Sequence, residues 1–347
     1  MLALAPNDEE ARAAVRALEL LARPTARIEA RGARDDQPAS LAEGALSASM
    51  GLDPLTFLDA EVSGLRLTSD VLAESVTLGA ARAGLRARLP GGALTVAASA
   101  GLRAGDGGRR TFLYRASLET PLGSGATLRL EVNRDVALDS ALSYRARVPV
   151  TSAALSLRAA RGQSQGAIEA RGLSYGDGNA GVSAFAWGLF PLAATAGVSL
   201  RGGGAVAWRD SRESRFRLES VTSHRSGTVF TYDYRGVFDP YVTPERQLEA
   251  RLLGEGSAQL GTRLSFRAHG EWGLGRERAT GFGPASGFAP LPTSVASASF
   301  PRTYHPWRAA AEVELKLEAS SFSAGVSRSS GAFYRVTAFA ASYWRRF

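Results

Sequence analysis

Polar and apolar residues alternate with a period of two along most of the chain after residue 24. Arg27, Glu29 and Arg31 alternate with Ile28 and Ala30, for example. The same pattern recurs at 126–133, 247–252, 263–271 and 312–318. A period of two predicts β-strands whose two faces meet different surroundings. In a soluble sandwich these are a core and water, whereas in a membrane barrel they are lipid and a lumen.

The breaks between the alternating segments differ in length. Short turns occur at 52–54, 90–92, 121–125, 162–165 and 191–194, and longer breaks alternate with them at 35–40, 69–74, 104–109, 134–150, 212–245 and 277–304. Short turns at one rim and longer loops at the other are typical of bacterial outer-membrane barrels.

Tracing the chain up and down between these breaks predicts about 16 strands, an even number. They lie near 25–34, 41–51, 55–68, 75–89, 92–103, 110–120, 125–134, 151–161, 165–175, 179–190, 194–210, 246–256, 260–276, 306–319, 321–329 and 332–346. We therefore expect an all-β, antiparallel up-and-down transmembrane barrel over residues 24–347. An extra hairpin or bulge within 211–245 or 321–329 would change the strand number by two.

The last strand has the pattern of a strand that closes a barrel. Counting back in twos from Phe347 gives Arg345, Tyr343, Ala341 and Phe339, an aromatic and small apolar face. A lipid-facing row with an aromatic girdle near the membrane surface has this composition. We expect this strand to pair with the first strand near 27–31; its least typical residue is Arg345.

The first 23 residues follow a different, helical pattern. Asn7 is a candidate N-cap, acidic residues occupy the next turn, and Pro24 ends the segment. The segment has no charged region followed by an apolar core, as a secretory signal would. The chain is then either cytosolic or the C-terminal portion of a longer exported protein. Its opening resembles the last helix of a tetratricopeptide array, which favours the second interpretation.

Composition excludes several classes of protein. Hydrophobic residues make up 45%, mean hydropathy is -0.08, and no apolar run reaches the length of about 18 that a membrane-spanning helix needs. Cysteine is absent, which excludes disulfides and thiolate metal sites. The net charge is +8, but arginines and glutamates are interleaved without a basic patch. This argues against a nucleic-acid partner.

Candidate catalytic groups are few. Of the three histidines, His224 and His305 fall in predicted loops and His269 in a strand. Ser265 and His269 share a strand face but lie about 13 Å apart along it, too far for direct proton transfer. No metal-ligand spacing occurs, so we predict no enzymatic activity, no cofactor and no metal.

The inner wall of the predicted barrel is the remaining candidate site. Its pore-lining charges are predicted to be Arg129, Glu131, Glu249, Arg251, Arg267, Glu271, Glu314, Lys316 and Glu318. Mixed charges can bind a hydroxyl-rich polymer weakly and repeatedly, as conduction requires. They can also pair with one another and brace the wall, and both roles can hold together. Trp187, Tyr144, Trp208 and Phe238 can stack on sugars or anchor the barrel at the lipid interface.

Three stretches resemble a known family. Residues 134–144 are similar to an R-x-V-x-DSLLSY loop, residues 234–246 to a GGYFSPQ loop, and residues 320–347 to a final hairpin. All three motifs come from the C-terminal barrel of tetratricopeptide-containing exopolysaccharide exporters. This is the cellulose synthase operon protein C family. The matching loop residues are Asp139, Ser140, Ser143, Tyr144, Phe238, Pro240 and Pro244. The chain departs from the family where Asp239 replaces a serine and where Tyr241–Thr243 interrupts the proline motif. Without the resemblance, both loops read as ordinary rigid connections.

The resemblance implies a channel in the bacterial outer membrane that exports an exopolysaccharide such as cellulose. The implied partners are the polymer, outer-membrane lipid, the barrel assembly machinery, and periplasmic and inner-membrane synthase components. Two other hypotheses remain at this stage. One is a general diffusion porin, which would conduct ions as an isolated barrel. The other is an envelope enzyme that uses the barrel as a scaffold, with Ser265 and His269 as its site.

Overall fold

The computed structural model describes residues 23–36, 39–69, 74–89, 94–106, 108–139, 141–226, 229–238, 240–284 and 295–347. The helix predicted over residues 1–23 lies outside these ranges except for its last residue. The division of the chain into 1–23 and 24–347 therefore stays a prediction.

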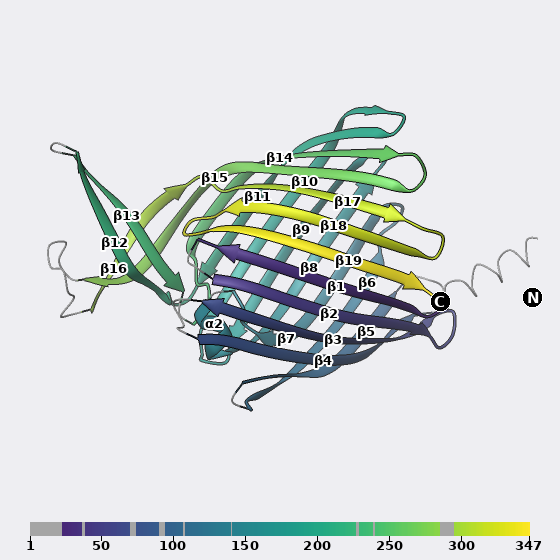
Figure 1. Cartoon of the computed structure of the whole chain (residues 1–347), viewed down its shortest axis with the longest axis horizontal. Coiled ribbons are helices and arrows are strands. Elements are labelled where there is room, and N and C mark those ends of the chain that lie inside the picture. The colour runs from purple at the N-terminus through teal and green to yellow at the C-terminus, as the bar shows by residue number, and fades with distance from the viewer. Residues whose placement is uncertain are drawn as a thin grey trace, which may run out of the picture.

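The described chain forms a closed antiparallel barrel of 16 strands, as the alternation predicted (Figure 1). Strand β19 pairs with β1 and closes the ring. The ring strands are β1 (Thr25–Asp35), β2 (Ala39–Gly51), β3 (Thr56–Ser69), β4 (Glu74–Arg88), β5 (Thr95–Gly105), β6 (Arg110–Pro121), β7 (Ala126–Val136), β8 (Pro149–Arg161), β9 (Ser164–Tyr175), β10 (Ala180–Thr195), β11 (Val198–Ser211), β14 (Glu245–Leu260), β15 (Leu264–Pro284), β17 (Trp307–Lys316), β18 (Ser320–Ser330) and β19 (Arg335–Arg346).

Three further strands and a short helix lie at one rim. The hairpin of β12 (Phe216–Ser226) and β13 (Val229–Phe238) stands between β11 and β14, which pair directly with each other. Strand β16 (Val295–Tyr304) pairs with the far half of β15, and helix α2 (Ala141–Ala146) follows β7. These strands project past the barrel in Figure 1. The extra hairpin considered for 211–245 thus exists, but it leaves the number of ring strands unchanged.

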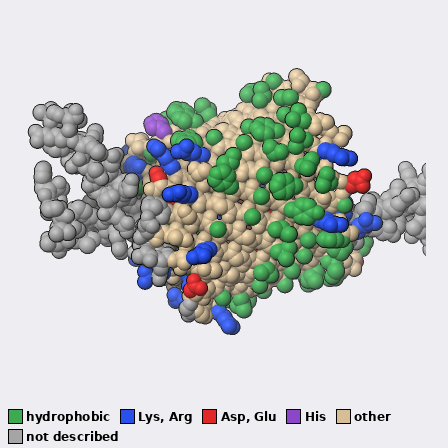
Figure 2. Space-filling model, viewed as in Figure 1, with side chains coloured by type: hydrophobic (Ala, Val, Ile, Leu, Met, Phe, Trp, Pro, Cys, Tyr) green, Lys and Arg blue, Asp and Glu red, His purple; other side chains and the backbone are tan. Residues whose placement is uncertain are grey.

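The outer face of the barrel is apolar. In the register of β1, β2 and β3, Ile28, Leu46 and Val62 lie side by side with 54%, 51% and 59% of their surfaces exposed. Hydrophobic side chains are spread over the strand surface in Figure 2. An apolar surface of this extent is unfavourable in water and suits contact with lipid.

Ion pairs between strands that are not neighbours show which side chains face the inside of the barrel. Arg82 on β4 and Arg103 on β5 both bind the carboxylate of Asp135 on β7. Since β4 and β7 do not pair in the sheet, these side chains can meet only across the concave interior. Because side chains alternate along a strand, this assigns every second residue of each strand to the lumen.

The opposite rim carries tight turns. Strands β8 and β9 are joined by Gly162 and Gln163, with Gly162 at a φ of +59°, where a side chain is disfavoured. Both Arg23 and Phe347 lie at this rim, and the Phe347 amide donates to the Pro24 carbonyl at 2.9 Å. No helix within the described ranges is long and apolar enough to span a membrane.

Candidate functional site: the lumen and its loops

The predicted pore-lining residues of β7 face the lumen and are paired. Glu131 accepts hydrogen bonds from Arg129 Nη2 at 2.6 Å and from Arg115 Nη2 of β6 at 2.7 Å. Arg129 also lies 3.9 Å from Glu119. These charges link neighbouring strands, as the bracing interpretation expected.

A second network links β14 and β15. Arg251 lies between Glu249 on its own strand and Glu271, to which Nη1 donates at 2.6 Å. His269 Nε2 lies 2.8 Å from the same Glu271, and the Tyr304 hydroxyl donates to Glu249 at 2.6 Å. Arginine held between two carboxylates stiffens this part of the wall.

The other predicted pore residues differ in placement. Arg267 lies 4.0 Å from Glu255, and Glu314 accepts from Ser265 at 3.4 Å and lies 3.6 Å from Lys316. Glu318 lies in the turn between β17 and β18 rather than on a ring strand. Whether any of these residues contacts a transported molecule stays a prediction.

The loop after β7 folds into the lumen. Its Tyr144, on α2, is buried in a cluster with Leu65 and Leu67 of β3 and Val76 and Leu78 of β4. These four wall residues share the inward-facing side of their strands with Arg82, so α2 packs against the inside of the barrel. Burial raises the pKa of Tyr144 to about 12. Ser143 is also fully buried.

A second loop, 240–244, is anchored by Tyr241. The Tyr241 ring is fully buried and stacks on Tyr175 with 3.9 Å between ring centroids and 7° between planes. Its hydroxyl donates to Asp177 Oδ1 at 2.9 Å, and Thr243 Oγ1 accepts from the Arg215 amide at 2.6 Å.

Asp139 connects the two loops, although they lie about a hundred residues apart in the sequence. Its carboxylate accepts from the Leu138 amide at 3.0 Å and from the backbone of Val242. Asp139 keeps solvent contact, yet the surrounding protein desolvates it and raises its pKa, an effect that exceeds the opposing hydrogen bonds and the nearby Arg209 charge. Ala137, Tyr175 and Tyr241 pack together beside it. The two loops therefore form one interlocked structure at the rim opposite the tight turns.

No family model and no curated protein matches the sequence, whereas many solved structures match the fold. A "Bacterial polysaccharide outer membrane secretin" aligns with a TM-score of 0.66 and 11% identity over 94% of this chain and 99% of the secretin. CdiB from Acinetobacter baumannii aligns with a TM-score of 0.50 and 10% identity over 93% of this chain and 60% of CdiB. The protein is an outer-membrane β-barrel. Its location in the bacterial outer membrane agrees with the apolar outer face.

The remaining candidate residues from the sequence are the serine and histidine of the enzyme hypothesis and the residues of the loop motifs. Ser265 binds Glu314 and His269 binds Glu271, so these two groups of the enzyme hypothesis engage separate glutamates. Ser140 lies outside the described residues, and Phe238 ends β13. Pro240 and Pro244 flank the buried Tyr241. No group of three or more histidine, aspartate or glutamate side chains suited to a metal occurs in the described part.

Sequence reasoning missed the partners that hold the second loop. Tyr241 appeared only as an interruption of a proline motif, and Tyr175 and Asp177 were read as the end of a strand and its turn. An aromatic residue enclosed by two prolines was the available signal. Its partners could not be found without the pairing of β9 with β10, β10 with β11 and β11 with β14, which brings Tyr175 and Asp177 to the rim where residues 240–244 lie.

Proposed function

We propose that this outer-membrane barrel is a passive channel that exports an exopolysaccharide. The observation that carries the proposal is the pair of interlocked loops at one end of a charged lumen, one of which packs against the inner wall. In outer-membrane barrels the tight turns face the periplasm and the longer loops face outward, so these loops lie at the outer mouth. Loops that narrow the outer mouth suit a channel that opens for one cargo.

The lumen chemistry supports a polar polymer as cargo. Guanidinium and carboxylate groups donate and accept hydrogen bonds along the whole wall, and a mobile polymer needs weak binding at many places. The secretin neighbour and the resemblance of both closing loops to exopolysaccharide exporters point in the same direction. The driving force would come from an inner-membrane synthase, with periplasmic components delivering the chain.

Deletion of the barrel tests this proposal directly. Cells without it are expected to continue polymer synthesis but retain the product inside, because the only step removed is passage across the outer membrane. Secreted and cell-associated polysaccharide are measured separately, with the restored gene as the control. Normal secretion from the deletion strain, or recovery of the protein in the soluble fraction, would refute the proposal.

Conductance separates the exporter from a general diffusion porin. The purified barrel in a planar bilayer is expected to conduct poorly, since α2 and the loop 240–244 lie inside one end of the lumen and narrow it. Replacement of 138–146 by a short glycine-serine linker removes α2 and is expected to raise ion conductance severalfold. High, steady conductance of the unmodified barrel would instead favour the porin.

A further inference from the structure

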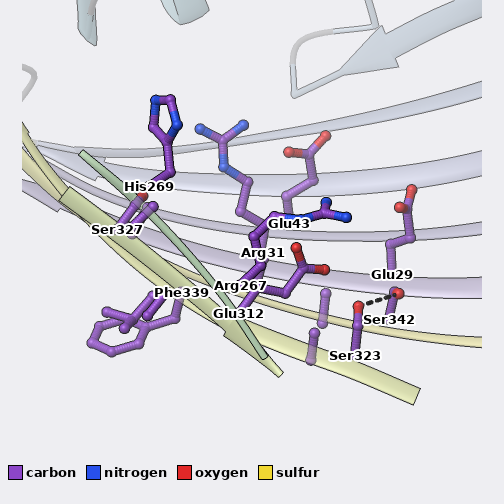
Figure 3. A pocket seen from close by; sticks show the side chains of 18 of the residues that line it. Glu29, Arg31, Glu43, Arg267, His269, Glu312, Ser323, Ser327, Phe339 and Ser342 are labelled. Carbon is purple, nitrogen blue, oxygen red and sulfur yellow. Dashed lines mark hydrogen bonds between the residues drawn. The ribbon is translucent and has the colours of Figure 1, made fainter. Parts of the chain in front are cut away.

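A recess of about 630 Å³ lies along the inner wall formed by β15, β17, β18, β19, β1 and β2. Figure 3 shows Glu29, Glu43 and His269 extending to one side of the sheet, and Phe339 pointing to the other. The first group faces the lumen and Phe339 faces lipid.

The register of six strands places one row of residues across this recess. In order, the row is Arg267, Glu312, Gly325, Ala340, Arg31 and Glu43, each the direct partner of the next. An arginine and a glutamate therefore stand on each side of a floor made of glycine and alanine.

The floor continues along the barrel axis with small residues. On β18 and β19 the lumen-facing neighbours of the row are Ser323 and Ser342, which share a hydrogen bond of 2.9 Å, and Ser327 and Ala338. With strands about 4.8 Å apart, Glu312 and Arg31 have backbones about 14 Å apart across the floor. This leaves a shallow trough wide enough for one extended sugar chain.

The charges beside the trough are available for a ligand. Among the residues that the structure describes, Arg31, Glu43, Arg308 and Glu312 have no ion-pair partner. Several other charges on the wall are engaged, as in Arg251 with Glu249 and Glu271. Unpaired donors and acceptors in equal number suit hydroxyl groups, which both donate and accept. A polyanion or a polycation would meet one repelling group for each attracting group.

An aromatic ring stands at the periplasmic end of the same floor. Trp344 on β19 pairs in register with Arg27 and Ser321, so it faces the lumen with Ser342. The Arg346 guanidinium lies 5.3 Å from its ring centroid. A flat indole face with polar groups beside it can hold one face of a sugar ring.

We propose that this trough is the track of the exported polymer, and that the polymer is an uncharged, hydroxyl-rich glycan. The inference rests on the export function and adds the chemical class of the cargo and its path. The polymer enters over Trp344 and slides along the β18–β19 floor. Arg267 and Glu312 lie on one side of it, and Arg31 and Glu43 lie on the other. Contacts shared among many weak sites let it advance.

Binding to the purified barrel tests the track. The probes are a neutral glucose hexasaccharide, an anionic uronic-acid hexasaccharide and a cationic glucosamine hexasaccharide, titrated calorimetrically in detergent micelles. The neutral probe is expected to bind at millimolar concentration, and the charged probes at least about tenfold more weakly. Absence of binding by the neutral probe, or tighter binding of a charged one, overturns the proposal.

Variants locate the site. Ala340→Trp fills the floor and is expected to weaken binding of the neutral probe by about tenfold or more. The matched control is Ser117→Trp on β6, a lumen-facing residue paired with Glu131 on a different part of the wall, and it is expected to bind as the unmodified protein does. Equal binding by both variants overturns the track. Heat-modifiable migration on gels shows that each variant has formed the barrel.

Charge reversal provides a gain-of-function readout. Glu43→Arg with Glu312→Arg makes both sides of the trough positive, so the anionic probe is expected to bind more tightly than the neutral one. Unchanged selectivity counts against the track. If deletion of the barrel abolishes export while Ala340→Trp binds normally, the track fails and the export function stands. If deletion leaves export intact, the export function itself fails.

Discussion

Tyr241 shows how a single residue can hold a loop inside a barrel. Its ring is enclosed against Tyr175, and its hydroxyl is bound by Asp177 of another connection. Tyr241 thus anchors the loop through one aromatic stack and one charged hydrogen bond, in addition to the contacts that Thr243 and Val242 make.

Tyr241→Ala is expected to release this loop. Removal of a buried aromatic side chain costs about 3–5 kcal/mol, which is large for one short loop. The expected result is faster proteolysis within 240–244 and higher ion conductance. Tyr241→Phe is the matched control, because it keeps the stack and loses only a hydrogen bond to a charged group, worth about 1.5–3 kcal/mol. An alanine variant with the protection of the unmodified barrel would contradict the anchoring role.

The raised pKa of Asp139 leads us to expect that the stability of the two interlocked loops depends on pH. Its pKa is raised from 3.8 in the folded state, so the folded loops bind the proton more tightly than the unfolded chain does. Stability contributed by protonated Asp139 is therefore present at low pH and is lost as pH rises through the raised pKa. Protection of 137–148 against hydrogen exchange is expected to fall over the interval that begins above pH 3.8. Asp139→Asn should remove that change, and an unaltered pH profile in this variant would refute the assignment.

At the level of elements, β19 confirms the outward row read from the sequence. Phe339, Ala341, Tyr343 and Arg345 alternate with the lumen-facing Ser342 and Trp344. The Arg345 guanidinium lies 5.2 Å from the Phe347 ring, so the least typical residue of the row makes a cation-π contact at the rim.

Removal of Phe347 tests the role of this end in assembly. Its amide holds Pro24 at the start of β1, and its exposed ring continues the aromatic row. The expected result is a severalfold lower amount of folded barrel in the outer membrane, measured by heat-modifiable migration of membrane fractions. Phe347→Tyr, which keeps an aromatic ring, is the control. Normal levels after deletion would argue against a barrel-closing role.

The ring strands could be predicted because lipid and lumen impose strict alternation on them. Each one overlaps its predicted range, and β15 runs further, to Pro284, where it continues beyond the ring to pair with β16. Strand β16 was missed, and the hairpin of β12 and β13 was considered only as an alternative, because these strands project from the rim, where no lipid face enforces an apolar row. The aromatic and β-branched residues of β13 at 229–234 were the available signal for the hairpin.

At the scale of the whole molecule, the sequence could show that charges face a lumen but not which of them are paired. Arg251 and Arg31 look alike in an alternating pattern, yet one lies between two carboxylates and the other has no ion-pair partner within the described chain. The difference arises from register across several strands. The meeting of 137–148 with 240–244 likewise depends on closure of the ring.

The seam between β1 and β19 joins residues from opposite ends of the barrel sequence, from Thr25 with Arg346 to Asp35 with Val336. The proposed track crosses this seam, because Ala340 belongs to one side and Arg31 to the other. A barrel arrested before closure therefore has no continuous track, besides exposing two unpaired strand edges. The pore would then become able to accept its cargo only after β1 and β19 have paired and the barrel has closed.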